Sequence, residues 1–361
     1  MTKRRGKLGR PPVKQGQIIA DLRGKILRGD IPPVGRLPTR RELGAQYRAS
    51  LPTVQQALDT LVADGFVQAK GTLGTFVVKS PPHLCRYGLV FPVHPGDPGP
   101  WSRFWTALVN EAMVINRSGP KKVSIFYGLG GHTDTDDYHS LLRELRHHTL
   151  AGLIFASQPS ALAGSPVLAM EGVARVAIMR PGWESLGVAA VSLDDASFMT
   201  KALDYLVSRG RSRLALIASA GDKVRREAFD VGLAARGLSA CPWWKQFVPV
   251  APPECASQVA MLLAHPDQSE RPDGIVIADD NLVESVTSGL MRVGVRVPAD
   301  MEIVGHCNFP WPTLSVVPVQ RLGYDSRQTL RACIEVIDAQ LRGEAPTTVE
   351  IPALFEDEVT P

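Results

Sequence analysis

The feature that most constrains the fold is a regular alternation of short apolar runs and amphipathic stretches, which begins at Tyr87 and continues towards the end of the 361-residue chain. Strand–helix alternation predicts parallel β-sheets with helices on both faces. Because this part is too long for one simple open sheet, we expect two lobes with a cleft between them. The predicted strands are 87–92, 123–127, 152–156, 174–179, 189–193, 213–218, 246–250, 274–278 and 302–306, and the predicted helices are 104–116, 138–147, 198–209, 225–236, 254–264, 282–293 and 326–342.

A different pattern precedes this region. Apolar residues at helical spacing predict a helix over 16–28, and the T-R-R-E run from Thr39 to Glu42 is a capping box that opens a short helix over about 40–47. Ser50 can cap a third helix, which two short strands around a Gly-containing turn follow. Three short helices and a hairpin predict a winged helix-turn-helix, with the third helix in the major groove of DNA and the hairpin at phosphates or the minor groove.

The two parts of the chain differ in charge. Residues 1–80 contain 15 Lys/Arg and 5 Asp/Glu, a net charge of +10, whereas the remaining 25 of 40 Lys/Arg and 31 of 36 Asp/Glu give residues 81–361 a net charge of −6. A basic module on an acidic body indicates a polyanionic partner for the module, although a solvated basic face is the alternative on charge alone. We therefore divide the chain into a flexible basic arm (1–15), a winged helix-turn-helix (16–79), a linker (80–86) and a two-lobed body (87–361).

The N-terminal block contains an ordered set of motifs: Arg28-Gly29-Asp30, Pro33-x-Gly35-x-Leu37-Pro38-Thr39-x-Arg41-Glu42-Leu43, Thr53-Val54-x-x-Ala57-Leu58-x-x-Leu61, Asp64-Gly65 and Gly71-Thr72-x-Gly74-Thr75-Phe76-Val77. With these motifs the block resembles the DNA-binding domain of the GntR family of bacterial transcription factors. The resemblance implies binding to a double-stranded DNA operator. The chain departs from the family at Leu51 and Gln55, where many relatives carry arginines, so the operator sequence does not follow from the resemblance.

Basic and short polar side chains mark the surface that we expect to meet DNA, because such groups contact phosphates near helix starts and in the wing. A glutamine on the third helix can pair bidentately with adenine. Gln55 and Gln56 either read a base in this way or form plain helix surface. The residues expected to contact DNA are Thr39, Arg40, Arg41, Ser50, Thr53, Gln55, Gln56, Lys70 and Thr72.

The body contains a second set of motifs: Tyr87-Gly88-Leu89-Val90, Leu150-Ala151-Gly152-Leu153-Ile154, Val191-Ser192-Leu193-Asp194-Asp195, Arg225-x-x-Ala228-Phe229 and Pro272-Asp273-Gly274-Ile275-x-x-Ala278-Asp279-Asp280. With these motifs it resembles the regulatory domain of the LacI family, which shares the two-lobed fold of type I periplasmic sugar-binding proteins. A GntR-like head on a LacI-like body is a combination met in arabinose-type repressors, so the two resemblances support each other. LacI relatives use a short hinge helix in the minor groove, and here the wing and the linker replace it.

The second resemblance implies that aromatic and charged side chains hold a small polar effector, a sugar or sugar derivative, between the lobes. Three assignments stay open from the sequence. Trp105 is either a stacking surface or part of the core, and Arg225 could exchange roles with Arg226. One of Asp279 and Asp280 could be only the N-cap of the following helix. The residues expected to bind the effector are Trp101, Ser102, Trp105, Asp194, Arg225, Asp280 and Asn308.

Together these features predict a cytoplasmic, homodimeric transcriptional regulator, in the first place a repressor. We expect it to bind a palindromic operator with one half-site per subunit and to be switched by the effector. Activation, or an effector that strengthens DNA binding, is an alternative within this class. The alternative from another class is a constitutive DNA-binding protein whose body serves only dimerisation.

Other classes of function are disfavoured by what the sequence lacks. The five cysteines are scattered without a Cys-x-x-Cys pair, which argues against a disulfide framework and a zinc site and indicates a reducing cytoplasm. No apolar segment of the secretory or membrane-spanning kind follows the basic residues 1–10. The chain has no G-x-S-x-G, Walker-lysine or H-E-x-x-H motif, so we expect neither enzymatic activity nor a cofactor or metal.

Overall fold

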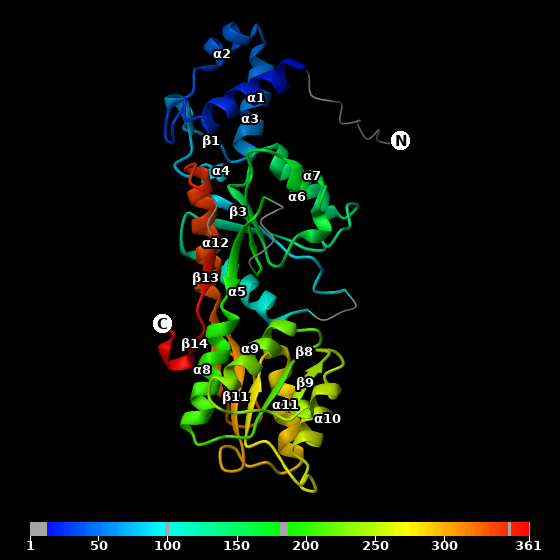
Figure 1. Ribbon diagram of the computed structural model, residues 1–361. Helices are drawn as coiled ribbons and strands as arrows, with labels where there is room; N and C mark the ends of the chain where they lie inside the picture. Colours follow the sequence, from blue (N-terminus) through cyan, green and yellow to red (C-terminus); the bar gives the residue numbers. More distant parts are fainter. Residues whose placement is uncertain (1–12, 98–100, 181–186, 346–347, 361) are drawn as a thin grey trace.

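The molecule consists of a small N-terminal domain and a larger two-lobed body, arranged along one long axis (Figure 1). The structure is a computed structural model, and it describes residues 13–97, 101–180, 187–345 and 348–360. The N-terminal domain lies at one end, the first lobe (lobe 1) in the middle and the second (lobe 2) at the other end. The winged domain with its two-stranded sheet and the body with its two six-stranded sheets confirm the fold class expected from the sequence.

The N-terminal domain is a winged helix-turn-helix. Its elements are α1 (Val13–Leu27), α2 (Arg40–Tyr47), α3 (Leu51–Ala63) and the antiparallel strands β1 (Val67–Ala69) and β2 (Thr75–Val77) of the wing. The capping box of Thr39 and Glu42 and the Ser50 cap both form as predicted, because these signals are local in the sequence. The core of the domain contains Ile18, Leu22, Leu37, Leu43, Val54, Leu58, Leu61 and Phe66.

Helix α1 begins at Val13, three residues before the predicted start at Gly16. The sequence prediction relied on apolar spacing, whereas the first turn is polar and is held from outside. The Lys14 ammonium donates a hydrogen bond to the Arg48 carbonyl at 2.6 Å, which ties the start of α1 to the end of α2. The flexible arm predicted over 1–15 is therefore shorter at its C-terminal end, and residues 1–12 lie outside the described residues.

Lobe 1 contains a six-stranded parallel sheet in the order β13-β7-β6-β5-β3-β4. Side chains alternate across it: Tyr87 and Leu89 pack with α5 and α12 on one face, and Val90 packs with α6 on the other. Its elements are β3 (Arg86–Val90), α5 (Arg103–Ser118), β4 (Lys122–Phe126), α6 (Asp136–Arg146), β5 (Gly152–Phe155), α7 (Pro166–Ala169), β6 (Ala174–Ile178), β7 (Ala189–Leu193), α12 (Ser326–Leu341) and β13 (Val349–Ile351).

Lobe 2 contains a six-stranded sheet in the order β14-β12-β11-β10-β8-β9, in which β14 is the antiparallel edge strand. Helices α8 and α9 cover one face, and α10 and α11 cover the other. Its elements are α8 (Asp195–Ser208), β8 (Leu214–Ser219), α9 (Lys223–Ala234), β9 (Lys245–Val248), α10 (Glu254–Leu263), β10 (Gly274–Ile277), α11 (Asp280–Arg292), β11 (Glu302–Phe309), β12 (Gln320–Asp325) and β14 (Leu354–Phe355).

Three connections join the lobes: β7 to α8, β12 to α12 and β13 to β14. Asp194 caps α8 and Asp325 caps α12, so each of these helices begins where the chain leaves a sheet. The Asp194 N–H also donates to the Ile351 carbonyl at 2.9 Å, and the Ala353 N–H donates to the Ser197 hydroxyl at 3.0 Å. These bonds hold two of the connections side by side, and any rotation of one lobe against the other pivots here.

The segment predicted as a linker, residues 80–86, contains regular secondary structure. Pro82–Cys85 forms the short helix α4, and Arg86 is already the first residue of β3. Proline is compatible with the first turn of a helix, which is why this proline-rich segment can form one.

The N-terminal domain contacts lobe 1 directly. The His83 ring of α4 stacks on Phe66 with 5.6 Å between the ring centroids. Asp64, the C-cap of α3, has its carboxylate 3.8 Å from Nδ1 of His147 at the end of α6. The winged domain and lobe 1 are therefore in contact through two elements, α4 and α6.

Candidate DNA-binding face and effector site

The expected DNA-binding surface is built around the starts of α2 and α3. The Thr39 hydroxyl accepts a hydrogen bond from the Glu42 N–H at 3.3 Å, and the Thr39 N–H donates to the Glu42 carboxylate at 2.7 Å. The Ser50 hydroxyl accepts from the Thr53 N–H at 3.4 Å and lies 2.8 Å from the Thr53 hydroxyl. Thr39 and Ser50 are exposed cap residues, and the remaining N–H groups of these helix starts suit phosphate oxygens.

A chain of side-chain hydrogen bonds crosses from α2 to α3. Arg40 donates from Nη1 to Oε1 of Gln55 at 2.9 Å, and Nε2 of Gln55 donates to Oδ1 of Asp59 at 2.7 Å. Both ends of the Gln55 amide are thus engaged within the protein, so the side chain of Gln55 holds Arg40 in place. Gln56 and Arg41 are exposed.

The wing presents a positioned cation at its tip. The Lys70 ammonium lies 5.1 Å from the centre of the Phe76 ring, and the Lys70 N–H donates to the Gly74 carbonyl at 2.8 Å. Thr72 is exposed in the single 3₁₀ turn Gly71–Leu73 that joins β1 to β2. Gly74 has φ +108°, a conformation that favours glycine and lets the chain turn back here.

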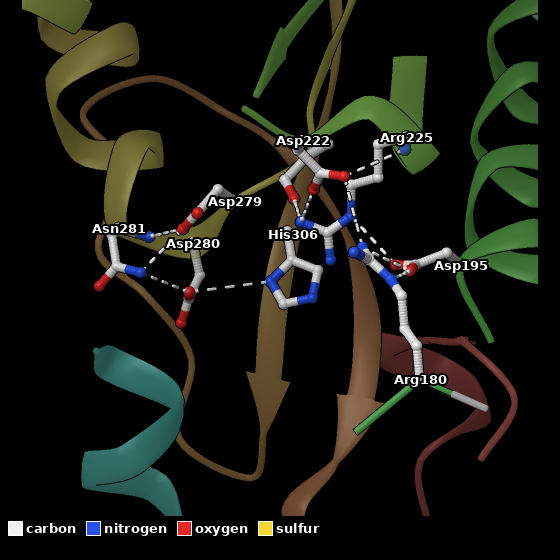
Figure 2. Close-up of polar contacts among 9 residues, drawn as sticks. Arg180, Asp195, Asp222, Arg225, Asp279, Asp280, Asn281 and His306 are labelled. Atoms are coloured by element: carbon white, nitrogen blue, oxygen red, sulfur yellow. Dashed lines mark hydrogen bonds and ion pairs between the residues drawn. The ribbon is translucent and has the colours of Figure 1, made fainter. Parts of the chain in front are cut away.

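Between the lobes, two arginines and two aspartates form a compact network of ion pairs (Figure 2). Arg225, in the first turn of α9, has Nε 3.1 Å from Oδ1 of Asp195 and Nη1 3.5 Å from Oδ2 of Asp222. Arg180, which follows β6 of lobe 1, lies 2.9 Å from Asp195 and 3.3 Å from Asp222. Burial by itself would lower the pKa of Arg225, but the Asp195 and Asp222 carboxylates raise it, so this guanidinium remains charged.

A buried carboxyl lies on the other side of His306 (Figure 2). Asp280, the first residue of α11, accepts a hydrogen bond from Nδ2 of Asn308 at 2.5 Å, and its Oδ1 is 3.9 Å from Nδ1 of His306. Burial and the neighbouring Asp279 carboxylate raise the pKa of Asp280 to about 7. Burial lowers the pKa of His306 well below its usual value, so this imidazole is neutral.

The expected aromatic residues form a cluster with the core of lobe 1. The ring centroids of Trp101 and Trp105 are 5.2 Å apart, and Phe91 lies 5.2 Å from the first and 6.1 Å from the second. The Trp105 indole N–H donates to the Ala156 carbonyl at 3.3 Å. Both indoles are half-buried, so Trp105 is part of the core and also retains an accessible surface. Ser102 occupies the N-cap position of α5 without making a side-chain cap hydrogen bond.

An interlobe cavity of about 680 Å³ lies between the start of α5 and helices α10 and α11. Trp101 and Arg103 of lobe 1 line it opposite side chains of α10 and α11, and Trp101 alone among the expected effector residues does so. The Arg103 N–H donates to Oδ1 of Asn281 at 2.9 Å, and the Arg103 guanidinium pairs with Glu284 at 2.7 Å. The lobes therefore touch each other beside Asp280.

Two family models match the chain. Residues 14–77 match that of the bacterial regulatory proteins of the gntR family, and residues 203–356 match that of the periplasmic binding protein-like domain. The chain joins a GntR domain to a periplasmic-binding-protein-like domain. The first match coincides with the winged helix-turn-helix, and the second covers lobe 2 together with α12 and β13 of lobe 1.

Two relatives are similar to this chain along most of its length and of their own. An arabinose metabolism transcriptional repressor of Halalkalibacterium halodurans is 23% identical over 358 residues, covering 89% of this chain and 89% of the relative. A repressor of the same name from Geobacillus stearothermophilus is 22% identical over 337 residues, covering 88% and 90%. Over the GntR domain, the repressor NagR of Bacillus subtilis is 37% identical in 73 residues, covering 20% of this chain and 30% of the relative.

Solved structures similar to this chain are regulators of the LacI family. One from Chloroflexus aggregans has a TM-score of 0.57 at 20% identity and covers 75% of this chain and 96% of its own. Another, from Lactobacillus casei with bound glucose, has a TM-score of 0.55 at 17% identity and covers 75% and 98%. The likeness establishes the LacI-type fold of the body, as the sequence predicted.

The structure distinguishes the alternatives that the sequence left open for Arg225 and Arg226 and for Asp279 and Asp280. Arg225 points into the network, whereas Arg226 is exposed, with its guanidinium 4.2 Å from the centre of the Phe247 ring. Asp279 is the N-cap of α11, because it accepts from the Asn281 N–H at 2.9 Å, and Asp280 is left to face Asn308. That these residues touch an effector stays a prediction.

Asp194, predicted to contact the effector, is the N-cap of α8, at one of the connections between the lobes. Its neighbour Asp195 forms the ion pair with Arg225. The sequence marks Asp194 and Asp195 together as an adjacent acidic pair, and it does not show which of them meets Arg225. Arg180 and Asp222 were missed because they become neighbours only in the fold. His306 was not among the expected effector residues.

Within the described ranges, no helix is long and apolar enough to cross a membrane.

Proposed function

We propose that this chain is a cytoplasmic transcriptional repressor whose GntR domain binds operator DNA and whose body binds a small polar effector, a sugar, between its lobes. The observation that carries the proposal is the union in one chain of a basic winged domain and a two-lobed body with charged groups buried where the lobes meet. The relatives named as arabinose repressors support both halves of the proposal, since they are similar along most of the chain.

On the DNA side, a homodimer formed through the bodies binds a palindromic operator, with one GntR domain at each half-site. The helix starts at Thr39 and Ser50 and the exposed Arg41 and Lys70 contact phosphates, and α3 enters the major groove. Arg40, held by Gln55, is presented for a guanine edge, because a guanidinium pairs bidentately with guanine. This replaces the adenine contact predicted for Gln55.

On the effector side, the lobes separate to admit the ligand and close over it. Opening breaks the Arg103–Glu284 ion pair and the hydrogen bond that the Trp311 indole donates to Glu111 at 2.9 Å. Trp101 and Trp105 then provide the apolar surface on which a sugar ring stacks, and polar side chains around Asp280 take its hydroxyls.

The signal reaches the DNA through lobe 1. Closure turns lobe 1 about the connections at Asp194 and Asp325, and α4 and α6 carry that movement to the GntR domain. A change in the spacing of the two winged domains needs a coupling free energy of only about 1–3 kcal/mol to alter operator affinity 5- to 150-fold.

The experiment has two steps. Thermal shift against a panel of pentoses and hexoses identifies a stabilising sugar, and fluorescence anisotropy with an operator selected from random DNA measures affinity with and without it. We expect at least one sugar to stabilise the protein and to weaken operator binding. The constitutive alternative predicts intact operator binding and no stabilisation by any small molecule, and that result would reject the proposal.

A further inference from the structure

The arginines between the lobes are already occupied by the protein's own carboxylates. Arg225 pairs with Asp195 and Asp222, and Arg180 pairs with the same two aspartates from the other lobe. The side chains of Arg225, Asp195 and Asp222 are about nine-tenths buried. To bind these guanidinium groups, a phosphate or carboxylate of a ligand would have to displace the buried carboxylates of Asp195 and Asp222 and leave them without a partner.

The other side of the site has carboxyls without a cation. Asp280 accepts a hydrogen bond from Asn308, and in the part of the chain that the structure describes neither Asp279 nor Asp280 forms an ion pair with lysine or arginine. After residue 12, the segments outside the described ranges (98–100, 181–186, 346–347 and 361) contain no lysine or arginine. Asp195 and Asp222 thus pair with both arginines of the network, and Asp279 and Asp280 are left without an ion-pair partner of this kind among the described residues.

Two further side chains in this site have unused hydrogen-bonding atoms. Asn308 is 1% exposed, and its Oδ1 has no partner among the described residues. His306 is 6% exposed, and neither ring nitrogen has a partner in the same part of the chain. Since the imidazole is neutral, the remaining capacity is mostly for accepting hydrogen bonds: the Asn308 amide oxygen, one nitrogen of His306, and the lone pairs of the Asp280 carboxyl that Asn308 and Asn281 leave free.

We infer that the effector is a polyhydroxylated molecule without a phosphate or carboxylate group, and that its hydroxyls donate hydrogen bonds to Asp280 and Asn308. This inference rests on the proposed function and specifies the ligand class of the same site. Hydroxyl groups supply both the donors that the three acceptors need and an acceptor for the N–H of His306. A phosphate offers acceptors and negative charge to a site that already has both, so the site selects a free sugar over its phosphorylated form.

Because Asp280 titrates near neutral pH, the pH dependence of ligand affinity is a second test of the ligand class. Asp279, Asn281, Asn308, Arg103, Arg225 and the neutral His306 are the polar groups around it, and burial, with the Asp279 carboxylate, raises its pKa to about 7. Hydroxyl donors bind the ionised carboxylate, so affinity for a free sugar rises with pH up to about 7 and then levels off. A phosphorylated sugar requires the protonated form, and its affinity changes with pH in the opposite direction.

Isothermal titration calorimetry of the full chain tests the inference with arabinose, ribose, glucose and galactose, each beside its monophosphate, at pH 6, 7 and 8. We expect a free sugar to bind and its phosphate to bind at least about tenfold more weakly. Asp280→Asn should lose most of the free-sugar affinity and narrow the gap to the phosphate. The matched control is Asp267→Asn, whose carboxylate is 92% exposed, and it should bind as the unmodified chain does.

The possible results distinguish failure of the proposed ligand class from failure of the proposed function. A phosphate that binds as tightly as its free sugar, or an affinity for the free sugar that falls as pH rises, overturns the inference and leaves the proposed function standing. Absence of binding by every free sugar and phosphate, with intact operator binding, rejects the proposed function and this inference with it. Circular dichroism of each variant establishes that it is folded before its affinity is read.

Discussion

Replacing Asp280 with Asn tests the electrostatics of the site without any ligand. Burial and the Asp279 carboxylate raise the pKa of Asp280 from 3.8 to about 7 in the folded protein. The folded state therefore holds this proton more tightly than the unfolded state does. As a consequence, ionisation of Asp280 lowers the free energy of unfolding progressively between about pH 4 and pH 7 and by a constant amount above that. At about 1.4 kcal/mol for each pKa unit, the full loss is about 4 kcal/mol.

Asp280→Asn removes this loss, because an amide does not ionise and its oxygen still accepts from Asn308. Between pH 5 and pH 8 the advantage of the variant in free energy of unfolding should grow by about 3 kcal/mol. For a body of this size, that corresponds to a Tm difference that widens by about 5–10 °C. The lower pH lies inside the titration window and the higher pH beyond it, so the two conditions bracket the effect.

Unfolding by heat and by urea, followed by tryptophan fluorescence in the absence of sugar, measures this difference. All six tryptophans lie in the body, so the signal reports on the part that contains Asp280. Asp267→Asn is the control and should be indifferent to pH relative to the unmodified chain. If Asp280→Asn had the same pH dependence of stability as the unmodified chain, the assignment of a raised pKa to Asp280 would be refuted.

Three further predictions concern DNA binding and the response to effector. Arg41→Ala should weaken binding to all DNA sequences alike and reduce the slope of log affinity against log salt by about 1, measured by anisotropy; an unchanged slope would contradict a phosphate contact. Gln55→Ala should release Arg40 and relax the preference for guanine at one operator position, measured by selection from random DNA. Retention of the full preference would show that Gln55 does not position Arg40 for this contact. Arg225→Ala should abolish the effector response with operator affinity near normal, and it should destabilise the body by up to about 3–5 kcal/mol, because the buried Asp195 and Asp222 carboxylates then keep only the exposed Arg180 as a cationic partner. Arg226→Ala, at the exposed neighbour, should do neither.

The sequence predicted those parts of the fold whose signals are local. Helices α2 and α3 begin where Thr39 and Ser50 act as caps, and each cap bond spans only three residues. Strand β12 was missed because its place depends on a distant neighbour. A Cβ on Gly323 would lie 1.8 Å from the Cys307 carbonyl oxygen, so the two strands approach closely only because this residue is glycine. The sequence of β12 alone does not show that the strand must approach β11 so closely.

The same limit applies to the site. Arg225 and Asp280 were identified because motifs of the LacI resemblance mark them, but the partners that decide their chemistry come from elsewhere in the chain. Asp195 is 30 residues from Arg225, and Asn308 is 28 residues from Asp280. Which of two adjacent aspartates turns inward depends on which one starts the helix: Asp194 caps α8, and Asp195 is therefore carried into the network.

The stability effect and the ligand preference at Asp280 have one physical origin. A buried carboxyl that lacks a cation lowers the stability of the empty protein as pH rises from its unfolded pKa to its folded pKa, and any ligand that donates hydrogen bonds to the ionised form recovers part of that loss on binding. A cation supplied by the protein itself would remove the loss, but it would also satisfy the carboxylate and leave it nothing to offer a hydroxyl. The unpaired Asp280 thus couples weaker folding of the empty body to tighter binding of a neutral sugar, and Asp280→Asn should reverse both effects together. A variant that gained stability and kept its sugar affinity would show that the carboxylate destabilises the body without contacting the ligand.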